Sequence, residues 1–165
     1  MKYKAAIFDM DGVLVDSEYH WHKLELKIWQ RLGVDTNKEF RERIVGMGIS
    51  SIAKLLREEQ GIDISEDKLA AELDEDAKKV YLESCNLIPG VKEILQMLQN
   101  SSVQLSLASA SPQNWVDMAL ERFDLKKYFP IALSTRTMKI TPKPDPAVFI
   151  RAMREMQVSP DSTVI

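Results

Sequence analysis

The 165-residue sequence contains a single cysteine, Cys85, so no disulfide can form within the chain. It lacks the long apolar run of a membrane-spanning helix or signal segment, because its first apolar run stops at Asp9. It also lacks an excess of one charge: 22 lysines and arginines are interspersed with 25 aspartates and glutamates. These absences argue against a disulfide scaffold, a membrane protein and a nucleic-acid partner, and they favour a cytoplasmic protein.

The sequence does contain several short apolar segments in which polar residues do not alternate with apolar ones. Residues 5–8 form such a run, which is typical of a strand buried on both faces in a parallel sheet. Residues 103–108 predict a second strand, and residues 129–133 a weaker third, which Pro130 places towards a sheet edge. Helical stripes follow these strands. The alternation predicts an α/β protein with a parallel, Rossmann-like sheet.

Residues 17–84 interrupt this alternation, because every segment there has a helical pattern. We therefore expect an inserted helical subdomain above the carboxyl end of the first strand. The expected boundaries are a stop at Gly33, a capping box that begins at Thr36, a start at Ser50, a stop at Gly61, a start at Ser65 and a last stripe that runs from Leu69 to Tyr81.

Two carboxylates, Asp9 and Asp11, come directly after the first predicted strand, and Gly12 permits a sharp turn behind them. An ionised aspartate can attack phosphorus, and a second one can protonate a leaving oxygen and later deprotonate water. Together they would attract a hard cation such as Mg2+. The alternative is an Asp-x-Asp-Gly turn without catalysis, which could bind calcium.

Two further segments offer groups that suit a phosphate. Ser109 ends the second predicted strand, and Ala110 and Ser111 lead into a helix whose first amides are exposed. Lys143 stands between two prolines in a loop, where a fixed ammonium can offset the charge of a phosphate and a carboxylate. Taken singly, Ser111 is better explained as a plain helix cap, and Lys143 as a solvated lysine.

In this order along the chain, these elements resemble the haloacid dehalogenase superfamily of phosphotransferases. Residues 9–12 match its first motif, Ser109 its second and Lys143 its third. The helical block is similar to the α-helical cap of that family, so we expect a core of residues 1–16 and 85–165 and a cap of residues 17–84. Four strings resemble the β-phosphoglucomutase-like branch, and among its members the sugar-phosphate phosphatases of the 2-deoxyglucose-6-phosphatase or hexitol phosphatase type: residues 16–18, 46–48, 107–112 and 143–146.

The resemblance implies roles for individual residues. Asp9 would be the nucleophile that forms an aspartyl phosphate, and Asp11 the general acid and base. The Asp9 carboxylate and the Asp11 main-chain carbonyl would bind Mg2+. Ser109 and Lys143 would hold the phosphoryl group. The further positions expected to bind phosphate or substrate are Met10, Gly12, Ala110, Ser111, Trp21 and Gly48.

Two cap positions depart from the branch. Mutases of this branch have a histidine where Trp21 stands, so the resemblance favours hydrolysis over mutase chemistry, which is the alternative. Many relatives have a substrate-binding arginine where Gly48 stands. The missing arginine leaves the individual substrate open. The resemblance implies a small phosphorylated metabolite, of the sugar-phosphate kind, as the substrate, and it implies a monomer.

The end of the sequence bears on the metal site. Residues 163–165 begin another apolar strand, which the family places beside the first one. The family's fourth motif, an acidic pair that completes the magnesium site, would follow this strand. We thus expect a core that is truncated before that motif, with an open edge along residues 5–8. A second hypothesis is a non-catalytic fragment that only binds phosphate.

Overall fold

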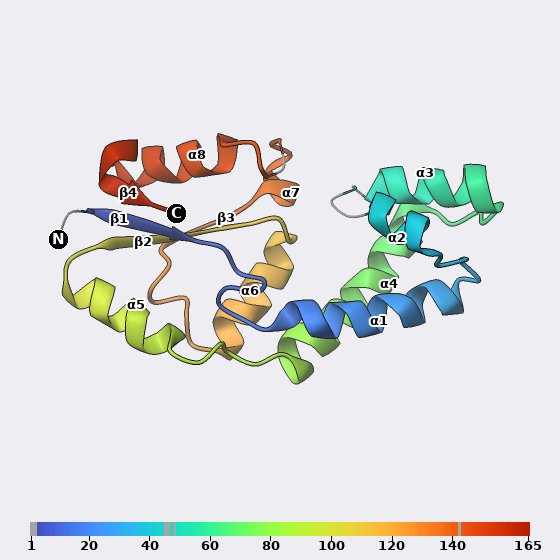
Figure 1. Cartoon of the computed structure of the whole chain (residues 1–165), viewed down its shortest axis with the longest axis horizontal. Helices are drawn as coiled ribbons and strands as arrows, with labels where there is room; N and C mark the ends of the chain where they lie inside the picture. The colour runs from blue at the N-terminus through green and yellow to red at the C-terminus, as the bar shows by residue number, and fades with distance from the viewer. Residues whose placement is uncertain (1–2, 45–46, 48, 142) are drawn as a thin grey trace.

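A four-stranded parallel sheet forms one half of the molecule (Figure 1). The structure, a computed structural model, describes residues 3–44, 47, 49–141 and 143–165. The strands lie in the order β3-β2-β1-β4. This arrangement confirms the predicted α/β class, and the bounds of the strands are β1 Ala5–Phe8, β2 Gln104–Ser109, β3 Ile131–Ser134 and β4 Thr163–Val164.

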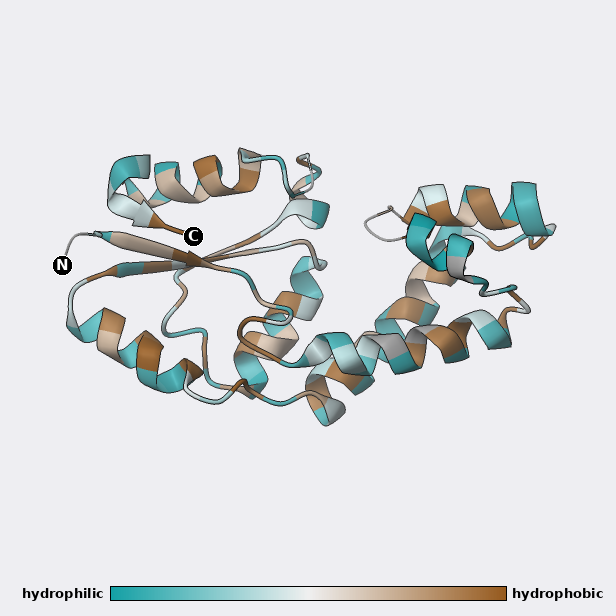
Figure 2. Cartoon of the chain, viewed as in Figure 1, coloured by the Kyte–Doolittle hydropathy of each residue, from teal (hydrophilic) through white to brown (hydrophobic). Residues whose placement is uncertain are grey.

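Helices cover both faces of the sheet, which explains why its strands are apolar without alternation. Ala5 and Ile7 of β1 point to the face under α8 (Ala147–Met156), where they pack with Val148. Ala6 points to the opposite face, where α5 (Val91–Asn100) and α6 (Gln113–Arg122) lie. Figure 2 shows hydrophobic and hydrophilic residues alternating along α5 and α8. Each helix thus turns one side to the sheet and the other to water.

The two edges of the sheet differ. At one edge β3 pairs with β2 from Ser106↔Ile131 to Ser109↔Ser134, and Pro130 lies just before the strand, as its missing amide requires. At the other edge the expectation of an open β1 was only half right. Ala5 and Ala6 pair with the two residues of β4, whereas Ile7 and Phe8 have no strand partner on that side in the described ranges.

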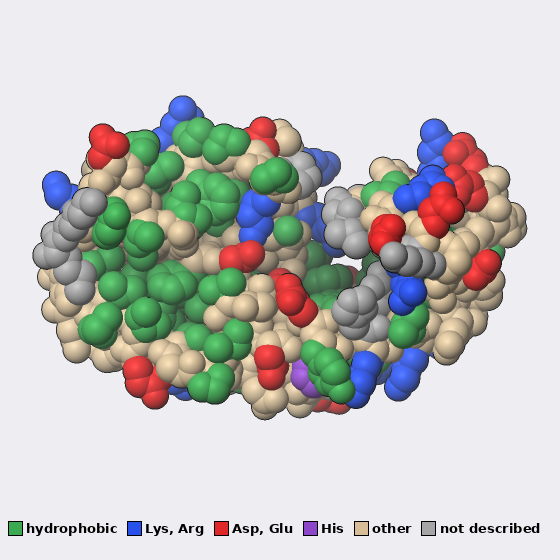
Figure 3. Space-filling model, viewed as in Figure 1, with side chains coloured by type: hydrophobic (Ala, Val, Ile, Leu, Met, Phe, Trp, Pro, Cys, Tyr) green, Lys and Arg blue, Asp and Glu red, His purple; other side chains and the backbone are tan. Residues whose placement is uncertain are grey.

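An apolar cavity of ≈ 600 Å³ lies along this unpaired end of β1. Figure 3 shows hydrophobic side chains gathered over β1, β4 and α5 on the face that it draws. The cavity ends at two charged residues of the candidate site. Its lining residues include Phe8, Asp9, Ile94, Leu98, Lys143 and Phe149.

The helical half of the molecule follows β1 in the chain. Its elements are α1 Ser17–Arg31, α2 Lys38–Ile44, α3 Ile49–Gln60, α4 Glu66–Lys78 and the π-helical turn η1 Lys79–Ser84. These helices enclose a hydrophobic cluster of their own, around Ile28, Trp29 and Leu56. Between β3 and α8 lies the short α7 Thr135–Met138, and η2 Pro160–Ser162 precedes β4. Among the described residues, no helix has both the length and the apolar character that crossing a bilayer requires.

The helix boundaries follow most of the sequence signals. Gly33 and Gly61 take positive φ angles of 71° and 67° just after α1 and α3, as a left-handed helix end requires. The side chain of Ser65 caps α4 by accepting from the amide of Lys68. The expected capping box at Thr36 was wrong by one residue, because Asn37 Oδ1 accepts from the Phe40 amide at 2.8 Å. The start expected at Ser50 falls one residue earlier, at Ile49.

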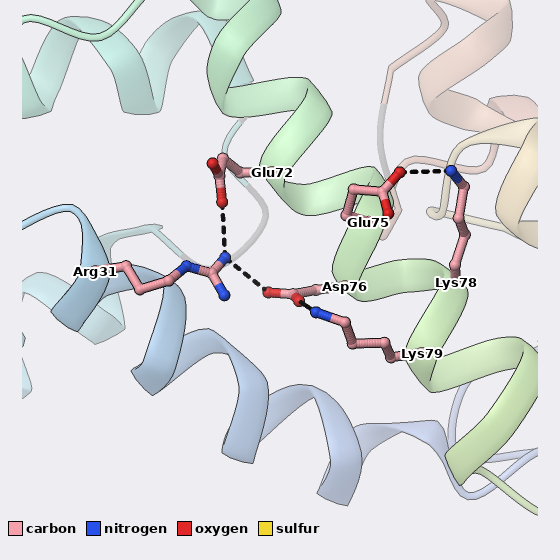
Figure 4. Close-up of polar contacts among 6 residues, drawn as sticks. All are labelled: Arg31, Glu72, Glu75, Asp76, Lys78 and Lys79. Carbon is pink, nitrogen blue, oxygen red and sulfur yellow. Dashed lines mark hydrogen bonds and ion pairs between the residues drawn. The ribbon is translucent and has the colours of Figure 1, made fainter.

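A buried charge joins α1 to α4. The side chain of Asp76 has no exposed surface, and its two oxygens lie 3.4 Å from Arg31 Nη2 and 2.8 Å from Lys79 Nζ (Figure 4). Arg31 also contacts Glu72 at 2.7 Å. Because both cations stay half exposed, they retain part of their hydration while they satisfy the carboxylate, which makes the buried charge tolerable.

Candidate active site

Asp9 and Asp11 lie in a tight turn at the carboxyl end of β1. The turn is closed by hydrogen bonds from the Gly12 amide to the Val15 carbonyl at 2.9 Å and from the Leu14 amide to the Met10 carbonyl at 2.8 Å. Gly12 has a φ of 72°, which a residue with a Cβ rarely adopts. The glycine therefore permits the tight turn in which the chain continues after the two carboxylates.

Lys143 comes from the loop before α8 and reaches Asp9. Its Nζ lies 2.7 Å from Asp9 Oδ2 and donates to the Ala108 carbonyl at 3.2 Å, so it also contacts the end of β2. Asp9 Oδ1 accepts from the Met10 amide at 2.8 Å. The Asp9 side chain remains 41% exposed, whereas that of Lys143 is 19% exposed. The carboxylate is thus open to a ligand on one side and neutralised on the other.

Asp11 accepts three hydroxyl hydrogen bonds. Its Oδ1 accepts from Ser17 Oγ at 2.5 Å and from the Tyr81 hydroxyl at 2.7 Å, while its Oδ2 accepts from Ser111 Oγ at 2.8 Å. These donors come from the start of α1, from η1 and from the turn after β2. Asp11, at the end of β1, is therefore hydrogen-bonded to both segments that lead into and out of the helical half, namely the start of α1 and η1.

The segment after β2 also reaches this site. Ser109 is buried, and its Oγ accepts from the amide of Ser111 at 3.0 Å. The simple explanation of Ser111 as a helix cap was wrong: Pro112 occupies the N-cap position of α6, and the Ser111 hydroxyl turns to Asp11 instead. Ala110 between them is exposed. The residue thus lies at the surface beside Ser111, whose hydroxyl contacts Asp11.

Trp21 lies between the two halves of the molecule. Its ring stacks on Trp115 of α6 with centroids 4.8 Å apart, and its Nε1 donates to the Tyr81 hydroxyl at 3.1 Å. Trp115 Nε1 in turn donates to Asp74 of α4 at 2.5 Å. Trp21 is thus an aromatic contact between α1 and α6 at the border of the site. The expected substrate position Gly48 lies outside the described residues.

Tyr81 contacts the site, but the sequence does not predict this contact. Its position on an apolar helical stripe predicts core packing, which is correct for its ring but gives no indication of its hydroxyl. Burial, and secondarily the charge of Asp11, raises the pKa of Tyr81 far above its ordinary value. The phenol therefore stays protonated and can act only as a hydrogen-bond donor towards the carboxylate. Ser17, the first residue of α1, was likewise expected only as part of the string of residues 16–18 that resembles the family.

Two oxygen atoms near the end of β1 are suitable ligands for a hard cation. The exposed Asp9 carboxylate is one, and the Asp11 main-chain carbonyl accepts no hydrogen bond from the part of the chain that the structure describes. Mg2+ is commonly held by one or two carboxylates together with water and substrate phosphate. No group of three or more histidine, cysteine, aspartate or glutamate side chains suited to a metal ion occurs among the described residues. The Asp9 carboxylate and the Asp11 carbonyl are thus two oxygen ligands that the described residues could supply to such an ion.

Comparisons with known proteins show which family the chain belongs to. A model of the haloacid dehalogenase-like hydrolase family matches residues 6–165. The phosphorylated carbohydrates phosphatase of Thermotoga maritima is 30% identical over 98% of this chain and 74% of its own length. Hexitol phosphatase B of Escherichia coli is 31% identical over 94% of this chain and 71% of its own.

A solved structure shares the fold. The structure of CbbY from Rhodobacter sphaeroides in complex with phosphate superimposes with a TM-score of 0.76 at 21% identity, over 98% of this chain and 76% of that one. The names of the two curated relatives support the expected enzyme class, a phosphoric monoester hydrolase. By the extent of the family match and the identity to these relatives, the chain belongs to the haloacid dehalogenase-like hydrolases.

Proposed function

We propose that the chain is a Mg2+-dependent phosphatase that hydrolyses a small phosphorylated metabolite, of the sugar-phosphate kind, through an aspartyl phosphate on Asp9. The observation that carries the proposal is the exposed Asp9 carboxylate, paired with Lys143 and next to the hydrogen-bonded Asp11. The printed names of the two phosphatase relatives support the substrate class. The helical half, residues 17–84, would be the cap over this site.

In the first step an oxygen of Asp9 forms a bond to phosphorus while the bond from phosphorus to the leaving oxygen breaks. The leaving oxygen takes the proton of the Asp11 carboxyl group, so the alcohol departs neutral. Lys143 offsets the charge that the Asp9 carboxylate and the phosphoryl group bring together. Ser109 and the amide of Ala110 would hold the phosphoryl oxygens.

In the second step Asp11, now a carboxylate, takes a proton from a water molecule as that water attacks phosphorus. The bond between phosphorus and Asp9 breaks, inorganic phosphate leaves, and both aspartates return to their starting states. When bound to the Asp9 carboxylate and the Asp11 carbonyl, Mg2+ would supply positive charge to the phosphoryl oxygens.

Hydrolysis of p-nitrophenyl phosphate with and without Mg2+ tests the proposal. We expect Mg2+-dependent turnover that falls at least about 1000-fold in Asp9→Asn and about 100-fold in Asp11→Asn, because the first loses the nucleophile and the second the base that takes a proton from the attacking water. A phosphoenzyme trapped by acid quench in Asp9→Asn would refute the assignment of Asp9. No turnover at any Mg2+ concentration would favour the second hypothesis, a chain that only binds phosphate.

A phosphosugar mutase is the alternative within the same family. Trp21 argues against it, because its ring stacks on Trp115 and its one polar atom is engaged by Tyr81, so it offers no proton acceptor for a sugar hydroxyl. We therefore expect no interconversion of glucose 1-phosphate and glucose 6-phosphate. Detecting that interconversion by the wild-type protein would replace the phosphatase proposal with the mutase.

A further inference from the structure

Tyr81 reaches the site from an irregular part of the backbone. The α-helix α4 passes directly into the π-helical turn η1, in which the Cys85 amide bonds to the Val80 carbonyl at 2.9 Å. A π turn places one extra residue in the helix and so redirects the side chains that follow. It also frees main-chain carbonyls from their usual partners.

Arg122 of the core helix α6 fixes this turn. Its guanidinium donates to the Tyr81 carbonyl at 2.9 Å and to the Glu83 carbonyl at 3.2 Å. A guanidinium can satisfy two carbonyls at once because its donors form a rigid, planar fork. The turn that carries Tyr81 is therefore attached to the sheet half of the molecule, on the side of Asp11.

The ring of Tyr81 is held from two sides. It is fully buried and contacts Trp21 and Trp115, with ring centroids 6.1 and 6.2 Å away. Its hydroxyl accepts from Trp21 Nε1 and donates to Asp11 Oδ1. The hydroxyl also lies 3.5 Å from Ser111 Oγ, but Asp11 Oδ1 is the nearer acceptor and carries the larger negative charge, so the Tyr81 proton points to Asp11.

The other two donors to Asp11 are less constrained. Ser17 and Ser111 each have a hydroxyl on a short side chain that can move by a single χ1 rotation. Tyr81 cannot follow such a change, since its ring is packed in place. Ser17 is also buried and donates to the same Oδ1 at 2.5 Å, but of the three donors only Tyr81 cannot turn away from Asp11 without moving a packed ring.

We propose that Tyr81 is a positioning residue, which holds the Asp11 carboxyl group in line with the leaving oxygen of the substrate. The inference rests on the proposed function, because it assigns Asp11 the proton transfer in phosphoenzyme formation. Tyr81 itself does not contact the reacting atoms. Its effect comes from orientation, on which general acid catalysis depends steeply.

Tyr81→Phe removes the hydroxyl and keeps the ring in its packed place. The readout is kcat/KM, which reports the steps up to phosphoenzyme formation, for two esters whose leaving groups need the acid to different degrees. Loss of a positioned acid should lower kcat/KM about tenfold or more for an alkyl ester such as glucose 6-phosphate, and less than about threefold for p-nitrophenyl phosphate. Nitrophenolate is the weaker base and departs without full protonation.

Tyr128→Phe is the matched control. Tyr128 is also buried, and its hydroxyl donates to Gln96 Oε1 at 3.1 Å, outside the site. This variant should leave the ratio of the two kcat/KM values unchanged. An equal fall for both esters in Tyr81→Phe, or no fall, would overturn the inference while leaving the phosphatase proposal in place.

A measurement that needs no turnover provides a second check. A double-mutant cycle of Tyr81→Phe and Asp11→Ala, followed by urea unfolding, should show the two changes to be coupled by roughly tenfold in the unfolding equilibrium constant. Additive effects would overturn the inference whatever the activity. Wild-type protein that hydrolyses neither ester would instead refute the proposed function, and the positioning role with it.

Discussion

The ammonium of Lys143 lies 2.7 Å from Oδ2 of Asp9, although the two residues come from opposite ends of the chain. The pair brings together the end of β1 and the loop before α8, and Lys143 spans the gap by also contacting the Ala108 carbonyl of β2. The charge of a carboxylate in this position is offset by the adjacent ammonium, which suits a nucleophile that must approach an anionic ester.

Replacing Lys143 tests this role. We expect Lys143→Met to lower kcat/KM for p-nitrophenyl phosphate by about 100-fold, because the charge of the attacking Asp9 and that of the phosphoryl group are then not offset. Lys139→Met is the control, since Lys139 is exposed in the preceding segment and should leave activity unchanged. Equal activities of the two variants would show that the ion pair is not used in catalysis.

Alanine substitutions at Gly12 and Gly33 distinguish the effect of backbone strain on stability from its effect on the active site. Gly12 and Gly33 have φ angles of 72° and 71°, so alanine at either position should cost about 1 kcal/mol of unfolding free energy. A Cβ at Gly33 meets open space, whereas one at Gly12 lies 3.0 Å from the Glu18 carboxyl group, which must swing away.

Only Gly12→Ala should also reduce turnover, because its strain falls in the turn that carries Asp9 and Asp11. Urea unfolding and p-nitrophenyl phosphate assays of both variants give the comparison. Unchanged turnover in Gly12→Ala, with the expected loss of stability, would mean that the turn tolerates adjustment without disturbing the carboxylates.

The sheet could be predicted from sequence because its signals are local. Residues 5–8 form a four-residue apolar run that ends at Asp9, and the observed strand has the same bounds. Glycine at a helix end is equally local, which is why Gly33 and Gly61 were placed correctly. Thr36 was misplaced because either of two neighbouring residues with a side-chain oxygen can cap a helix, and only the backbone decides between them.

The environment of Asp11 could not be predicted in the same way. Its three hydroxyl donors come from residues far apart in sequence, and the direction of each depends on tertiary packing. Ser111 has the sequence context of a helix cap, and Tyr81 that of a core residue. Both expectations follow from local pattern, and a π turn held by Arg122 is what turns Tyr81 to the site.

Cys85 allows a test of how closed the joint between the two halves is. Burial raises the pKa of the Cys85 thiol to about 11, although the nearby Arg122 acts in the opposite direction. The thiolate fraction at about pH 8 is then roughly one in a thousand, far below that of an ordinary cysteine.

Labelling of the folded protein with a disulfide reagent should therefore be slow at about pH 8. Its rate should rise about tenfold per pH unit towards the raised pKa, since the thiolate fraction rises by that factor below the pKa. In concentrated urea the single thiol should react fast, with the ordinary pH dependence. Rapid, complete labelling of the folded protein near neutral pH would show that η1 opens readily.

The buried carboxylate of Asp76 should stabilise the contact between α1 and α4 more than a surface ion pair does. Asp76→Ala removes hydrogen bonds to two cations, at a cost of about 2 kcal/mol in unfolding free energy. The loss should not be larger, because Arg31 and Lys79 are half exposed and can be rehydrated, and Arg31 keeps Glu72. The control is Glu75, which pairs with Lys78 on the exposed side of the same helix, away from Asp76 (Figure 4). Glu75→Ala should not change the urea midpoint measurably, because water screens that pair. Equal midpoints for the two variants would show that the buried carboxylate does not add to stability, as happens where the cost of desolvating a charge cancels the attraction to its partners.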